Sequence, residues 1–136
     1  MQTPKVKTLV FDADGVVVIP AHRFPVYCKD ELNLDPGRTQ EFFRGPFSDC
    51  LTGKADLKEV IAPFLPRWGW GGSVDEFLER WFQVEHNINR PLVEAVQALR
   101  RRGFRCAVAT NQEKYRLSYM RNEMGFGRLF DEVFGS

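Results

Sequence analysis

The sequence predicts an α/β fold in which a parallel sheet core is interrupted by an inserted block of helices. Two apolar runs, TLVF near the N-terminus and FRCAVAT further on, are typical of strands buried on both faces. Between them, helical periodicity replaces the strand pattern. We therefore expect an α/β core of residues 1–19 and 90–136, with about three strands present, and a helical cap over residues 20–89.

The first strand is expected from about Val6 to Phe11, and about four helices should follow it. The first of these helices has apolar residues from Phe24 to Leu32 at the spacing of one helical face. The segment RTQEFFRGPFSDCLTG forms the second helix, with a break near Gly45-Pro46.

Two further helices complete the expected cap. The third, ADLKEVIAPFLPRWG, is opened by Asp56 and closed by Pro66 and Gly69. The fourth, VDEFLERWFQVE, is capped by Ser73, and Glu76 three residues later completes a capping box.

The remaining elements alternate between helix and strand. After Pro91, a favoured first-turn residue, LVEAVQALRRRG predicts an amphipathic helix that ends at Gly103. A strand over residues 104–109 follows, then the polar loop TNQEK and the helix YRLSYMRNEMGFG. Val133 and Phe134 begin a third strand. This order predicts parallel pairing with right-handed crossovers.

Composition limits the class of protein and its partners. The chain has 136 residues, of which 43% are hydrophobic and 27% charged, as in folded globular domains. Because 19 basic residues nearly balance 18 acidic ones, we expect no nucleic-acid partner.

The expected location is cytoplasmic. The polar start MQTPKVK predicts no signal peptide, and no apolar run is long enough to span a membrane. Cys28, Cys50 and Cys106 are far apart and odd in number, which favours reduced thiols.

Two aspartates, Asp12 and Asp14, follow the first strand and are themselves followed by Gly15. Carboxylates at the end of a buried strand are costly unless they are paired or bind a metal. Open α/β sheets bind ligands at the carboxyl ends of their strands. A simple turn is the alternative, since Asp and Gly both suit turns. The pair Thr110-Asn111, at the end of the next strand, favours a catalytic site over a turn.

With FDADGV near the N-terminus, a helical insert, and VATNQ ending the next strand, the chain resembles the haloacid dehalogenase (HAD) superfamily. It is most similar to phosphatase-like members with a helical cap inserted after the first strand. The resemblance implies a Rossmann-like sheet with a central first strand. It also implies Mg²⁺-dependent hydrolysis of a small phosphorylated metabolite, a phosphate monoester, through an aspartyl-phosphate.

The chemistry accounts for the spacing of the two aspartates. Asp12 can attack phosphorus, and Asp14 can protonate the leaving oxygen and then deprotonate water. The resemblance implies that Mg²⁺ binds the Asp12 side chain and the main-chain carbonyl of Asp14. Gly15 would allow a tight turn against the phosphate, and Thr110 and Asn111 would bind its oxygens.

Substrate choice is expected to lie in the cap. Arg23, Arg44 and Lys54 are the candidate substrate-binding groups, together with His22. Each of these, taken singly, also fits a solvated surface residue.

The family pattern breaks at the C-terminus. Members carry a lysine after the third strand and acidic residues after the fourth, whereas this chain stops at Ser136. We therefore expect a C-terminally truncated member with impaired turnover. Lys114 could replace the missing lysine, although a surface lysine is the simpler interpretation.

Truncation would leave the outer edge of the first strand unpaired, which would allow a homodimer through that edge. A catalytically incomplete HAD-fold protein used for binding or dimerisation is therefore the first alternative function. A mutase or dehalogenase reaction is the second, and Asp14 weakens the dehalogenase option because that reaction needs no leaving-group acid.

Overall fold

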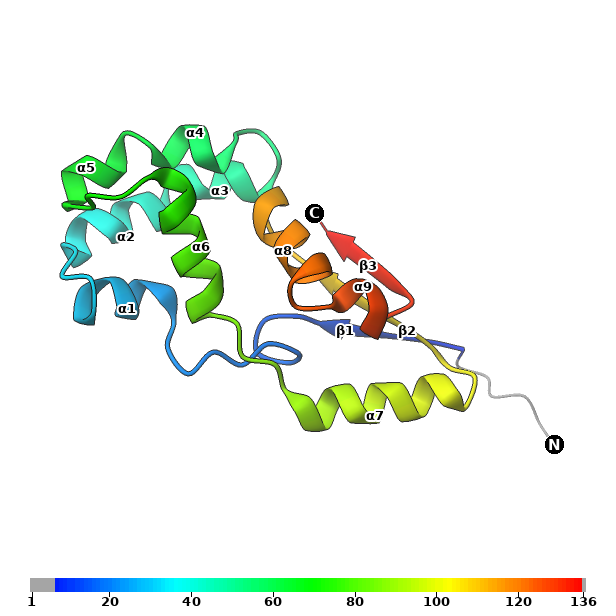
Figure 1. Ribbon diagram of the computed structural model, residues 1–136. Coiled ribbons are helices and arrows are strands. Elements are labelled where there is room, and N and C mark those ends of the chain that lie inside the picture. The colour runs from blue at the N-terminus through cyan, green and yellow to red at the C-terminus, as the bar shows by residue number, and fades with distance from the viewer. Residues whose placement is uncertain (1–6, 136) are drawn as a thin grey trace.

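The computed structural model describes residues 7–135 and contains a three-stranded parallel sheet (Figure 1). The strands are β1 (Thr8–Asp12), β2 (Arg105–Thr110) and β3 (Glu132–Gly135), in the spatial order β1-β2-β3. The α/β fold class and the parallel pairing predicted from the sequence are confirmed. Val6, where the first strand was expected to begin, lies outside the described residues, as do residues 1–5 of the segment to which the signal-peptide prediction refers.

The register places the carboxyl ends of all three strands at one edge of the sheet. Asp12 pairs with Ala109 across β1 and β2, and Thr110 pairs with Gly135 across β2 and β3. Because the strands are parallel, side chains that follow Asp12 and Thr110 emerge on the same side of the molecule.

Seven helices lie between β1 and β2 in the sequence, and the first six gather at one end of the molecule in Figure 1. Six short helices stand where about four were expected. Gly45-Pro46 separates α2 from α3 as predicted, but a second break at Pro63 divides the third expected helix. The six are α1 (Phe24–Asp30), α2 (Pro36–Arg44), α3 (Pro46–Leu51), α4 (Leu57–Ile61), α5 (Phe64–Trp68) and α6 (Val74–Val84).

The prediction that Pro66 closes a helix was wrong. Pro66 is the third residue of α5, where its missing N–H would have no intrahelical partner in any case. Gly69 does end this helix, in the left-handed conformation with φ of 93°. Ser73 caps α6 by accepting a hydrogen bond from the Glu76 N–H at 3.1 Å.

The six helices, called the cap below, have a hydrophobic core of their own that is rich in aromatic side chains. Phe24, Phe42 and Phe77 are completely buried, with Trp68 and Trp81 beside them. The rings of Phe24 and Trp81 are stacked with centroids 5.2 Å apart. Burying one such side chain contributes about 1.5–3 kcal/mol, so these short helices are stabilised by packing and not by length.

Three more helices pack on one face of the sheet: α7 (Arg90–Arg101), α8 (Lys114–Asn122) and α9 (Phe126–Leu129). Their apolar side chains meet alternate residues of the strands, which point to the same side. The buried members of this second core are Ala13, Val17, Val18, Val96, Cys106, Val108, Met120, Met124, Phe126 and Phe130.

The other face of the sheet carries exposed apolar side chains. Val10 of β1 is 61% exposed and Phe134 of β3 is 53% exposed, and both alternate with residues of the buried face. On β2, Ala107 is paired with Val10 and Ala109 is paired with Phe134. Within residues 7–135, β1 pairs with β2 along one side only.

The two connections between the cap and the sheet are hydrogen-bonded to each other. The Ile19 N–H donates to the Asn87 carbonyl, and the Asn89 N–H donates to the Val17 carbonyl, both at 2.8 Å. The side chains of Asn87 and Asn89 donate back, to the carbonyls of Ile19 and Val16. The cap is thus joined to the sheet through a paired two-stranded link.

The three cysteines are buried and free, in agreement with the prediction of reduced thiols. Burial raises the pKa of the Cys28 thiol to about 12, so this thiol is a packing residue and a poor nucleophile. Among the helices that the structure describes, none combines the length and the apolar character needed to cross a bilayer.

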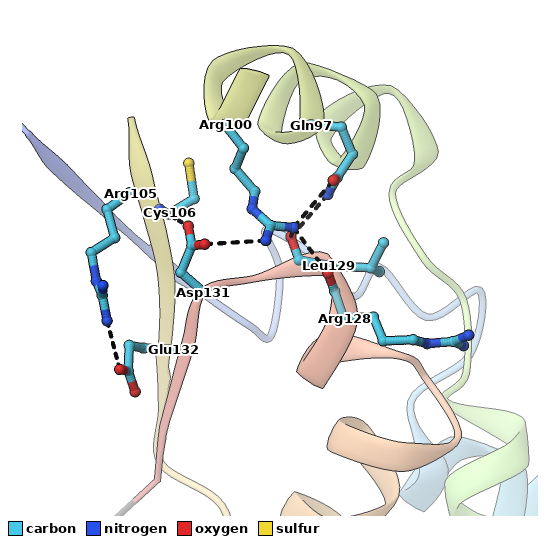
Figure 2. A network of polar contacts seen from close by, with 8 residues as sticks. All are labelled: Gln97, Arg100, Arg105, Cys106, Arg128, Leu129, Asp131 and Glu132. Carbon is cyan, nitrogen blue, oxygen red and sulfur yellow. Dashed lines mark hydrogen bonds and ion pairs between the residues drawn. The ribbon is translucent and has the colours of Figure 1, made fainter. Parts of the chain in front are cut away.

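A polar network connects α7, α9 and the sheet at the amino end of β2 (Figure 2). This is the end of the sheet away from Asp12 and Asp14. Arg100 donates to the carbonyls of Arg128 and Leu129 at 2.9 and 3.0 Å, and to Asp131 at 3.1 Å. Asp131 in turn accepts the N–H of buried Cys106 at 2.8 Å, and this bond lowers the pKa of Asp131. The guanidinium therefore satisfies the last carbonyls of α9.

Replacing Asp131 with Ala should destabilise the fold by about 1–3 kcal/mol. The buried Cys106 N–H would lose its acceptor, and Arg100 would lose one of its acceptors. Urea unfolding would measure this loss. The control is Glu132→Ala, which removes an exposed pair with Arg105 and should cost less than about 1 kcal/mol. Equal losses in the two variants would contradict the role given to this network.

Candidate functional site

The candidate site begins at the carboxyl end of β1. Asp12 is the last residue of that strand and is exposed, while Asp14 lies in the tight turn that follows. Gly15 adopts a φ of 80°, and its N–H donates to the Val18 carbonyl at 2.8 Å. A side chain at Gly15 would meet no atom within 4 Å, so the backbone conformation is what requires glycine here.

The ends of β1 and β2 are connected through one amide side chain. Gln112 Nε2 donates to Asp14 Oδ2 at 2.5 Å and to Thr110 Oγ1 at 3.0 Å. Thr110 and Gln112 are both buried. Asp14 and Thr110, which are 96 positions apart in the sequence, therefore share a hydrogen-bonding partner.

A buried cation stands beside Asp14. Arg116, on the first turn of α8, is only 4% exposed. Its guanidinium contacts Asp14 Oδ1 at 3.3 Å and Glu85 Oε1 at 3.0 Å. The Trp81 indole N–H also donates to Glu85. Two carboxylates thus compensate one buried positive charge.

The helix α8 starts at Lys114, one residue before the start at Tyr115 that the sequence predicted. Its N-cap is Glu113, which accepts the N–H groups of Tyr115 and Arg116. Asn111, which was predicted to bind the phosphate, lies in the loop before this cap and is exposed. Burial raises the pKa of the Glu113 carboxyl, and the two backbone N–H donors oppose that effect.

A cavity of about 560 Å³ opens between the cap and the sheet beside Asp14. Its polar lining contains Asn111, Gln112 and Arg116 from the sheet side and Arg23 from the cap. The remaining lining is mostly apolar, which is typical of sites for small molecules. Its apolar members are Ile19, Pro20, Pro25, Phe43, Phe47, Leu51 and Trp81.

Of the cap residues predicted to bind substrate, two line cavities and two do not. Arg23 lines the large cavity, while Lys54 lines a smaller one of about 260 Å³ that also contains Gln112. Arg44 is exposed at the end of α2 and lines neither cavity, and His22 is exposed.

Lys114 forms a link between the cap and the sheet. Its ammonium lies 2.6 Å from Asp56, which also accepts the Tyr115 hydroxyl at 2.7 Å and caps α4. These two donors hold the pKa of Asp56 down at about 2. Lys114 is thus directed toward the cap residue Asp56.

The end of β1 offers oxygen ligands that a divalent cation could use. Residues 7–135 contain no cluster of three or more His, Cys, Asp or Glu side chains arranged to hold a metal. Mg²⁺, however, is commonly bound by one or two carboxylates, with waters and substrate phosphate completing its shell. Exposed Asp12 and the backbone after it fit a partial site of that kind.

Comparison with solved structures identifies the fold. A HAD family enzyme from Bacteroides thetaiotaomicron in complex with magnesium superposes with a TM-score of 0.72 at 16% identity, covering 96% of this chain and 68% of that one. The same enzyme with magnesium and inorganic phosphate gives 0.69 at 14% identity, covering 95% and 68%. A predicted HAD-like hydrolase from Porphyromonas gingivalis gives 0.67 at 17% identity, covering 96% and 66%.

These likenesses show that the chain has the HAD-like fold, which confirms at that level the resemblance predicted from the sequence. The chain spans about two thirds of the length of these structures. No protein-family model matches it, and no curated protein matches it in sequence.

Sequence reasoning missed Gln112, Arg116 and Glu85. A charged residue soon after the strand that ends at Thr110 is a signal for a group near the site, and Lys114 was named on that basis. Successive helical residues are rotated by about 100°, so Arg116 lies on a different side of α8 from Lys114. Only the tertiary structure shows which of the two faces Asp14.

The link between Asp56 and Lys114 gives a prediction about pH. Since the pKa of Asp56 is lowered in the folded state, its ion pair should stabilise the fold above about pH 4, with the benefit lost as the pH falls through about 2. Asp56→Asn keeps an N-cap but removes the charge. The wild type should exceed this variant in unfolding free energy at pH 6, and the difference should vanish near pH 2.

The control for this prediction is Asp30→Asn, an exposed position at the end of α1. Denaturant titrations at several pH values would follow both variants. A difference at Asp56 that is constant from pH 6 to pH 2 would contradict the assigned ion pair.

Proposed function

We propose that this chain carries the reaction centre of a HAD-type phosphatase, which hydrolyses a small phosphate monoester through an aspartyl-phosphate on Asp12. One observation supports this most strongly: Asp14 and Thr110 meet through Gln112 at the strand ends, beside a cavity between cap and sheet. The two structures of the Bacteroides thetaiotaomicron enzyme described above contain magnesium, and one of them also contains inorganic phosphate, which is consistent with this chemistry.

The proposed reaction has two displacements. In the first, an Asp12 oxygen forms a bond to phosphorus while the bond to the ester oxygen breaks, and Asp14 gives its proton to that oxygen. In the second, water attacks the phosphorus, Asp14 accepts a proton from the water, and the bond to Asp12 breaks. Inorganic phosphate leaves and both carboxyl groups return to their starting state.

The remaining groups bind and orient the substrate in this proposal. Thr110 and Asn111 donate hydrogen bonds to phosphoryl oxygens, and Arg23 contacts the organic part of the ester in the cavity. Asp12 and the Asp14 carbonyl would hold Mg²⁺, which supplies positive charge against the transferring phosphoryl group.

Asp12→Asn should lower Mg²⁺-dependent phosphate release from p-nitrophenyl phosphate by more than about 1000-fold, because the nucleophile is lost. Asp12 is exposed, so the variant should remain folded, and its thermal unfolding curve would verify this. Asp30→Asn, prepared identically, serves as the control. The proposal would be wrong if wild type and Asp12→Asn released phosphate equally, or if the folded wild type released none.

Self-association is a second candidate function, favoured by the exposed apolar face of the sheet. Val10 and Phe134 stand on that face, and apolar patches of this kind commonly mark interfaces. A binding or dimerisation role would use the same fold without requiring turnover.

Val10→Asp should convert a dimer to a monomer, because it places a charge in the centre of the proposed interface. Analytical ultracentrifugation across a range of concentrations would measure the change. Val26→Asp, at a comparably exposed apolar position on α1, is the matched control with 48% exposure. A wild type that is monomeric at all concentrations would rule out self-association.

A further inference from the structure

Arg116 is a buried charged group to which the reaction scheme above gives no role. Its guanidinium is almost fully removed from water and lies between two carboxylates from different parts of the chain. A buried cation is retained only where such partners compensate it. The identity of those partners indicates what Arg116 does.

The first partner, Glu85, belongs to the end of the cap. It is the C-cap residue of α6, and it also accepts the indole N–H of Trp81 in the cap core. Two residues later, Asn87 begins the paired link to the sheet. Glu85 therefore belongs to the cap and lies just before the segment, residues 87–89, that connects the cap to the sheet.

The second partner, Asp14, is the proposed proton donor. Arg116 in the first turn of α8 donates to its Oδ1, and Gln112 in the loop before α8 donates to its Oδ2, so both carboxylate oxygens are held in place. The side chain of Asp14 is otherwise 55% exposed toward solvent and the cavity. A proton donor must be held in a productive orientation to act efficiently, and here that orientation depends on two side chains.

We propose that Arg116 is a positioning residue that orients Asp14 for proton transfer to the leaving group and links this orientation to the cap through Glu85. This inference rests on the proposed function. It adds that the cap contributes to the reaction centre through the Glu85–Arg116–Asp14 chain, in addition to covering the cavity.

The test compares two phosphate esters that differ in their need for a proton donor. p-Nitrophenolate leaves readily without protonation, whereas the alkoxide of 2-phenylethyl phosphate requires it. Arg116→Met should lower kcat for 2-phenylethyl phosphate at least about tenfold more than for p-nitrophenyl phosphate. Asp14→Asn should show the same selectivity, more strongly. Arg116→Lys keeps the positive charge but loses the planar guanidinium that can donate to two carboxylates. Its ratio of the two kcat values should therefore lie between those of the wild type and Arg116→Met.

The control is Arg121→Met, on the same helix, where the guanidinium donates to the Val133 carbonyl at the surface. It should leave the ratio of the two kcat values unchanged. If Arg116→Met and Arg116→Lys each lower kcat by the same factor for both esters, Arg116 has only a structural role and the inference is wrong. If Arg116→Met does not fold, Arg116→Lys and Glu85→Gln decide the outcome by the same ratio.

A second measurement needs no turnover. Asp14→Asn and Glu85→Gln should be non-additive in urea unfolding, because each leaves Arg116 with one carboxylate and the double variant leaves it with none. In the Arg116→Met background this coupling should vanish or change sign, since only repulsion between the carboxylates remains. Additive effects in the wild-type background would overturn the link to the cap.

The failure of the inference can be told apart from failure of the proposed function. If Asp14→Asn is selective against the alkyl ester while the Arg116 variants are not, the reaction scheme stands and the role of Arg116 is wrong. If the folded wild type releases no phosphate from either ester, the reaction scheme fails and the positioning role fails with it.

Discussion

The parallel register of β1 and β2 is the constraint on which the rest of the structure depends. With Asp12 opposite Ala109, the two chain segments that leave these strands emerge at one edge of the sheet. The turn that contains Asp14 follows β1, and Thr110, the last residue of β2, leads into the loop before α8. A shift of one residue would move every side chain of β1 to the opposite face and separate these groups.

The cap depends on the same edge, because both of its connections start there. Its buried core is distinct from the core under the sheet, but Tyr119 of α8 packs against both, with its ring 5.4 Å from that of Phe82 in the cap. The position of the cap is set by this aromatic contact, by the paired link of residues 17–19 with 87–89 and by polar contacts with the first turn of α8. Among the polar contacts, the buried Arg116–Glu85 pair would be the costlier to break.

The first turn of α8 therefore has two functions in the architecture. Lys114 and Tyr115 face Asp56 at one end of the cap, while Arg116 faces Glu85 at the other. Glu113, buried beneath them, caps the helix and fixes where that turn begins. Four consecutive residues thus hold the helix start, the cap and Asp14 in one arrangement.

The sequence by itself determined the fold class, the existence of the helical insert and the two aspartates at the end of a strand. These follow from local signals: unbroken apolar runs, helical periodicity, and carboxylates where a buried strand stops. It did not determine the break at Pro63 or the break between α8 and α9, because helix ends depend on caps and packing that neighbouring elements supply. Only the tertiary structure decided that Arg116, and not Lys114, faces Asp14. Side chains two residues apart on a helix point in different directions, and what each one meets depends on elements distant in the sequence.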